Sequence, residues 1–137
     1  MGDDGAMSIL RVSINIATAT RDLAELDEYT GASATRWAAI GSPVNEFDPT
    51  GPAREISQWH LDSAIEEGAQ LLEPHLEVLR PVLERMAYVP FDGVLYASFS
   101  IAVQGRENGF VFDIEPLDAA LIARAGLRLR IDAYTPL

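Results

Sequence analysis

Arginine, tyrosine, aspartate and small polar residues alternate with apolar residues along several stretches of this 137-residue chain. If these stretches are strands, the alternation gathers the polar side chains on one face of a sheet. Arginine and tyrosine are favoured at the energetic centres of binding surfaces. We therefore predict a binding surface formed by Arg11, Tyr96, Asp113, Arg128, Arg130, Asp132 and Tyr134, with Ser13, Asn15, Ser98, Ser100 and Gln104 on the same face. The alternative is a solvated face stabilised by ion pairs, for example Arg130 with Asp113.

The two histidines, His60 and His75, are the other candidates for chemistry. His60 and Asp62 would share one face of a strand, whereas His75 would lie on a helix, where it could only flank the core. A metal site or a histidine base would need these residues to converge around an open position. The chain has no cysteine, which excludes disulfides, thiolate catalysis and cysteine-based zinc sites. We expect no metal ion and no cofactor.

Motifs that mark enzymes are absent from the sequence. There is no GxSxG, no phosphate-binding loop and no GxGxxG, and no pair of carboxylates stands out at a recognisable spacing. An enzyme is not excluded, but no residue can be named as catalytic.

The net charge is −11. It would repel the phosphates of nucleic acids, and it would suit a basic partner. The alternative is that the charge simply keeps the protein soluble. No apolar run approaches the roughly 20 residues of a membrane span. Residues 1–7 are acidic and rich in glycine, which predicts a disordered tail, and Met7 could serve as an alternative start. A bacterial cytoplasm is the expected location.

The polar surface needs strands to position it. The predicted strands cover residues 8–18, 34–40, 58–61, 94–104, 110–114 and 127–134, and the predicted helices cover residues 21–29, 63–87 and 116–125. Residues 105–109 would form the hairpin loop between two of the strands. Trp37 and Trp59 are expected to pack in the core or at its rim. Residues 8–137 would thus form one α+β domain with a mostly antiparallel sheet of four to five strands.

The longest helix organises this domain. Its core-facing stripe recurs at steps of four and three residues and comprises Ile65, Ala69, Leu72, Leu76, Leu79, Leu83 and Met86. Pro74 and Pro81 lie on the opposite side, and each removes a helical hydrogen bond. We expect either a helix bent by its prolines or two helices meeting near Pro74. This helix and the shorter ones would pack on one face of the sheet, and the polar face would stay wet.

Several short segments resemble the DUF4279 family of small bacterial proteins. They are Gly31-Ala32-Ser33-Ala34-Thr35, Gly41-Ser42-Pro43, Trp59-His60-Leu61-Asp62-Ser63, the helix with Leu76, Leu79 and Pro81, and the ending Leu121…Gly126-Leu127…Ile131-Asp132-Ala133-Tyr134. The resemblance covers nearly the whole chain after residue 7. The family has no known function, so it supplies no catalytic residue. It implies a link with bacterial toxin–immunity loci.

These observations favour a non-enzymatic binding protein, such as an immunity-like neutraliser of a basic partner. The alternatives are a small-molecule-binding domain with a pocket near Trp37 and Trp59, or an enzyme of unknown class. A flat polar face would favour the first hypothesis, and a pocket lined by tryptophan would favour the second. Convergence of the two histidines with Asp62 would favour the third. The sequence leaves open whether the chain is a monomer or a homodimer.

Overall fold

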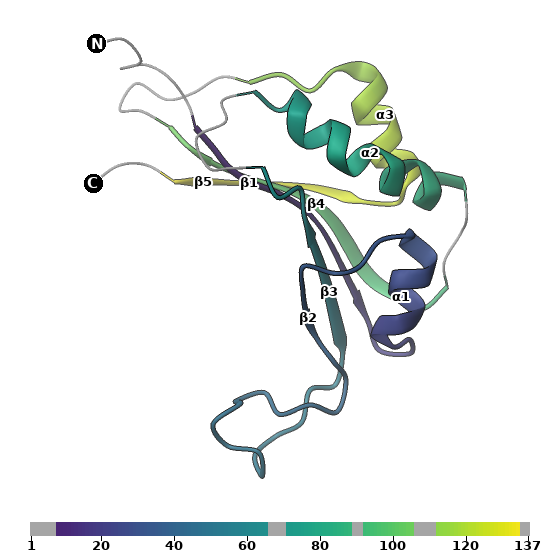
Figure 1. The fold of residues 1–137 in the computed structure, drawn as a ribbon, viewed down its shortest axis with the longest axis vertical. Coiled ribbons are helices and arrows are strands. Elements are labelled where there is room, and N and C mark those ends of the chain that lie inside the picture. The colour runs from purple at the N-terminus through teal and green to yellow at the C-terminus, as the bar shows by residue number, and fades with distance from the viewer. Residues whose placement is uncertain (1–7, 66–70, 89–91, 106–111, 135–137) are drawn as a thin grey trace.

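The computed structural model describes residues 8–65, 71–88, 92–105 and 112–134 (Figure 1). The elements are β1 (Ser8–Thr18), α1 (Leu23–Thr30), β2 (Arg36–Ala38), β3 (Ser57–Asp62), α2 (Glu73–Tyr88), β4 (Val94–Gln104), α3 (Pro116–Arg124) and β5 (Arg128–Tyr134). The predicted tail, and most of the hairpin loop predicted at 105–109, lie outside the described residues.

The five strands form one sheet in the order β2-β3-β1-β4-β5. Neighbouring strands are antiparallel except β4 and β5, which run parallel. The predicted α+β class and mostly antiparallel sheet are confirmed. The predicted strand at 110–114 is wrong where it can be seen, because Phe112–Ile114 form no strand. Instead the chain crosses over through α3 and returns as β5 beside β4, and such a crossover produces a parallel pair.

One face of the sheet is apolar because apolar and polar residues alternate along the central parts of β1 and β4, between the irregularities in their pairing at Ile9/Arg11 and Ala17/Thr18. Val12, Ile14 and Ile16 of β1 lie on this face and are fully buried, as are Phe99 and Ile101 of β4. Figure 1 shows all three helices on the same side of the sheet. Their buried side chains belong to the same core cluster as these strand residues. No helix of the described residues covers the opposite, polar face, which is the layer arrangement expected from the sequence.

Helix α2 is shorter than predicted. It begins at Glu73, and Pro74 therefore stands in its first turn, where the fixed φ and missing N–H of proline are tolerated. Ala64 has a left-handed backbone (φ 61°), so the residues described just before the gap at 66–70 do not continue a helix. No two helices meet at Pro74 in the described part of the chain. Pro81 does lie inside α2, with its ring exposed as expected.

Several side-chain placements differ from the prediction. His75 is fully buried, because it lies on the inner side of the first turn of α2 instead of flanking the core. Trp59 is buried, but Trp37 is 65% exposed, since β2 is a three-residue edge strand with little to cover it. Leu95 and Leu117, each near the start of its element, are exposed.

Candidate functional site

A row of polar residues crosses all five strands on the uncovered face. In chain register it runs from β2 to β5 through Arg36, His60, Asn15, Ser98 and Arg128. Directly opposed residues of neighbouring strands share a face, so the row is continuous. Polar side chains from all five strands therefore build one surface.

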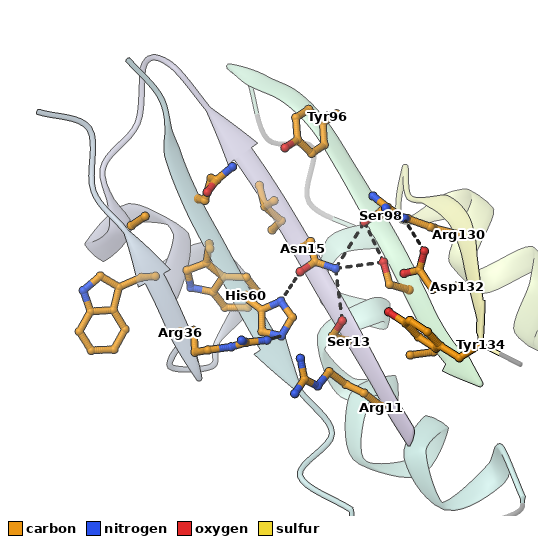
Figure 2. Close-up of a pocket in the computed structure, with 17 residues that line it drawn as sticks. Arg11, Ser13, Asn15, Arg36, His60, Tyr96, Ser98, Arg130, Asp132 and Tyr134 are labelled. Carbon is orange, nitrogen blue, oxygen red and sulfur yellow. Dashed lines mark hydrogen bonds and ion pairs between the residues drawn. The ribbon is translucent and has the colours of Figure 1, made fainter. Parts of the chain in front are cut away.

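Asn15 is the centre of this surface (Figure 2). Its side-chain N–H₂ group lies 3.3 Å from the hydroxyl of Ser13, 3.4 Å from that of Ser98 and 3.1 Å from that of Ser100. Its carbonyl oxygen accepts a hydrogen bond from Nδ1 of His60. Asn15 thereby links the serines of the inner strands to the histidine of β3 and fixes a polar floor in the middle of the sheet.

His60 has two competing partners at its other ring nitrogen. Nε2 lies 2.9 Å from the guanidinium of Arg36 and 2.6 Å from Oδ1 of Asp62. Burial lowers the pKa of His60, although the hydrogen bond and charge of Asp62 act to raise it, and Arg36 and Arg11 lower it further. With Nδ1–H directed at Asn15, Nε2 accepts from Arg36 in the neutral imidazole and donates to Asp62 in the imidazolium, and the lowered pKa favours the neutral form. The predicted placement of His60 and Asp62 on one strand face is confirmed.

This surface is hollowed. A cavity of about 460 Å³ lies over it. The cavity is lined by Arg11, Ser13, Asn15, Ile16, Arg36, Trp37, Ala38, Gln58, Trp59, His60, Tyr96, Ser98, Ser100, Ala102, Arg130, Asp132 and Tyr134. The lining holds three arginines and one aspartate in a chain whose net charge is −11, and Asp62, just outside the lining, pairs with Arg11 at 3.9 Å. We call this cavity the sheet hollow.

The structure brings five of the seven predicted binding residues into the sheet hollow. They are Arg11, Tyr96, Arg130, Asp132 and Tyr134. Arg128 lies on β5 outside the lining, and Asp113 lies in the connection before α3. The suggested pair of Arg130 with Asp113 does not appear among the ion pairs of the described residues, because 112–114 is not a strand. Arg130 instead contacts Asp132, two residues along the same strand, at 3.2 Å.

The histidines do not converge. His75 lies in the core on the helix side of the sheet, where its Nδ1 is 2.7 Å from the hydroxyl of Ser63. His60 lies on the polar face. Within the described residues no three histidine or carboxylate side chains are grouped as metal ligands. Convergence of the two histidines with Asp62 was the feature that would favour an enzyme, and the two histidines lie on opposite faces of the sheet.

The serines of the sheet hollow are not set up as nucleophiles. A catalytic serine needs a base within hydrogen-bond reach. Ser98 and Ser100 contact each other at 3.2 Å and the amide of Asn15, and an amide is not a base. His60 contacts the carbonyl oxygen of the Asn15 amide, whereas the serines contact its nitrogen. The hydroxyl and amide groups of this floor can both donate and accept hydrogen bonds.

Arg36 is the site residue that sequence reasoning missed. It stands on β2, and a three-residue strand is too short to show alternation. His60 is predicted to share a strand face with Asp62, but not to belong to the binding surface. The available signal was its position: His60 and Asp62 are spaced by two on a strand, as Arg11, Ser13 and Asn15 are, and so belong to a polar face.

Comparisons of the chain with family models, with curated proteins and with solved structures found no match. The resemblance to the DUF4279 family is thus neither supported nor contradicted. Among the helices of the described residues, none is long and apolar enough to cross a membrane.

Proposed function

We propose that the protein is a non-enzymatic binding protein that holds a small anionic molecule in the sheet hollow. The observation that carries this proposal is the placement of Arg11, Arg36 and Arg130, from three different strands, around one cavity. Guanidinium groups bind carboxylates and phosphates through paired, charge-assisted hydrogen bonds. A volume of about 460 Å³ is in the range of pockets that hold small ligands.

The floor of the hollow supports the same proposal. Serine hydroxyls can rotate to donate or accept, so Ser13, Ser98 and Ser100 can match the polar groups of a ligand. Asn15 holds these hydroxyls in place. Trp37 lines the hollow and is 65% exposed, which leaves an aromatic face available for contact. A ligand with an anionic group and a polar or planar body fits this combination.

The proposal is tested by calorimetric titration with inorganic phosphate, succinate and glycerol. We expect one or both anions to bind and neutral glycerol not to bind. Arg36→Gln and Arg130→Gln should each weaken anion binding by about 10- to 100-fold, since hydrogen bonds to charged groups contribute about 1.5–3 kcal/mol. Arg54→Gln is the matched control, because Arg54 lies outside the hollow. Failure of both anions to bind, or equal affinity in all variants, would contradict the proposal.

A basic protein partner is the second candidate, and the groove between α2 and α3 favours it. This groove is lined by Glu73, Arg80, Glu84, Tyr88, Glu115, Pro116, Leu117, Asp118, Leu121 and Arg124. Carboxylates outnumber arginines there, and the side chains of Tyr88 and Leu117 are highly exposed. Glu84→Lys should weaken association with a basic partner, most clearly at low salt, and leave anion binding in the sheet hollow unchanged.

A further inference from the structure

Strand β5 (Arg128–Tyr134) is an open edge of the sheet. It pairs with β4 on one side, and no other strand of the described residues pairs with its outer side. Long, regular edge strands usually carry charged side chains, proline or a bulge that prevents pairing with another chain. This one has seven residues with no proline and no bulge, and its charged residues Arg128, Arg130 and Asp132 carry both signs. Leu129 and Ile131 are 46% and 39% exposed, so the edge also offers apolar surface.

The backbone of β5 has polar groups directed outward. The carbonyl of Tyr134 accepts a hydrogen bond from the N–H of Gly105, at 3.0 Å, on the β4 side. Backbone groups alternate in direction along a strand, so those of the odd-numbered residues point away from β4. Leu129, Ile131 and Ala133 therefore present donors and acceptors that a further strand could satisfy.

The sequence of β5 is complementary to itself when it is paired antiparallel about Ile131. All seven residues then have a partner, and Ile131 faces Ile131 of the second copy. Arg130 faces Asp132 of the second copy, and Asp132 faces the second copy's Arg130. Opposite charges in direct register stabilise a strand pair. Arg128 faces the ring of Tyr134 from the second copy, a favourable contact between a cation and an aromatic ring.

Neighbouring registers are disfavoured. A two-fold axis perpendicular to the sheet places the polar faces of both copies on the same side. Directly opposed residues must then come from the same face, so the axis lies midway between two copies of the same residue. Centred on Arg130, the two copies place arginine directly opposite arginine. Centred on Asp132, they place aspartate opposite aspartate. Like charges in direct register are destabilising, and both alternatives also leave part of the strand unpaired.

We propose that two copies of the protein associate through β5 in this register, as a symmetric dimer with one continuous sheet. The symmetry is the isologous kind that is commonest in homodimers. Both polar faces then lie on the same side. Arg130, Asp132 and Tyr134 line the sheet hollow and also stand at the junction, so the two hollows adjoin across the axis. The inference rests on β5 and does not depend on anion binding.

The experiment is sedimentation equilibrium of the full chain over a range of protein concentrations. We expect the mass to rise from that of one chain to that of two. Arg130→Asp and Asp132→Arg, each alone, place like charges opposite each other in the dimer and should abolish the rise. An equimolar mixture of the two variants restores opposite charges at every pair, so it should form a dimer of twice the single-chain mass.

Arg124→Glu is the matched control, because Arg124 is an exposed arginine at the end of α3 and is not part of β5. This variant should remain dimeric. The proposal is overturned by a wild-type chain that stays monomeric at every concentration, by single variants that still dimerise, or by a mixture that stays monomeric. Circular dichroism checks that each variant is folded, and recovery of the dimer in the mixture excludes misfolding as the cause of dissociation.

Discussion

The buried His75 should make the stability of the protein depend on pH in a predictable direction. Its side chain is fully buried, and burial lowers its pKa from the ordinary value of 6.5. The unfolded chain therefore binds a proton more readily than the folded chain. The contribution of neutral His75 to the free energy of unfolding is fully present above about pH 6.5. It falls as the pH drops from 6.5 toward the lower pKa of the folded state, because protonation of the unfolded chain then favours unfolding.

The size of this effect follows from one proton. While His75 stays neutral in the folded state, the free energy of unfolding falls by up to about 1.4 kcal/mol for each pH unit below 6.5. Among the described residues its Nε2 has no hydrogen-bond partner, and its Nδ1 contacts only Ser63. A buried polar group without a partner costs about 1–3 kcal/mol of stability. Removing the His75 ring eliminates this cost at Nε2, which offsets the loss of the hydrogen bond between Nδ1 and Ser63.

The matched variant is Ser63→Ala combined with His75→Leu. At pH 7.5 we expect its stability to be within about 1 kcal/mol of the wild type, because both hydrogen-bonding partners are replaced together. Ser63→Ala alone should cost about 1–3 kcal/mol, since it leaves Nδ1 unpaired as well. Between pH 7.5 and 5.5 the double variant should lose less stability than the wild type.

The assay is chemical denaturation at a series of pH values, with NMR titration of the histidine rings. Only two histidines are present, and His60→Gln assigns their signals. Burial also lowers the pKa of His60, so the variant retains that part of the pH dependence. An identical loss of stability in wild type and double variant, or a His75 signal that titrates near 6.5, would refute the reasoning.

Three further predictions concern the fold, and denaturation measured by tryptophan fluorescence checks each. Gly31→Ala should cost about 1–2 kcal/mol, because Gly31 has φ of 73° and an added Cβ would lie 3.3 Å from Arg85 Cδ; no loss would contradict this. Asp27→Ala should cost about 1.5–3 kcal/mol by removing the carboxylate that accepts from Trp59 Nε1 at 2.7 Å, and an unchanged midpoint would be the contrary result. Pro81→Ala should change stability by less than about 3 kcal/mol, because the ring is exposed; a larger loss would show that the proline is needed.

The sequence predicts the sheet well where a strand is long. The bounds of β1 and β4 agree with the alternation, because eleven residues each give the pattern room to repeat. It predicts the start of α2 poorly. The stripe that begins at Ile65 continues the helical spacing, but Ala64 adopts a left-handed backbone and α2 begins only at Glu73. Spacing reports which residues could share a face, and it does not report where the chain turns.

The candidate site shows the same limit. Alternation placed Arg11, Arg130 and Tyr134 on the polar face, and the structure brings them around one hollow. It could not supply Arg36, whose strand is too short, or the strand order that puts β2 and β5 at opposite edges. Strand order is set by the crossover through α3 and by packing between distant parts of the chain, which a local pattern does not contain.

The net charge of −11 and the arginine-lined hollow suggest opposite partners, and distance decides between them. At physiological salt the Debye length is about 8 Å, so carboxylates elsewhere on the surface are largely screened from a molecule held in the hollow. Arg11, Arg36 and Arg130 line the hollow and act at contact distance. The overall charge governs how fast a charged molecule arrives, whereas the local guanidinium groups govern whether an anion stays bound. Raising the salt concentration should therefore reduce the repulsion that slows an approaching anion, and it should weaken association of a basic partner at α2 and α3.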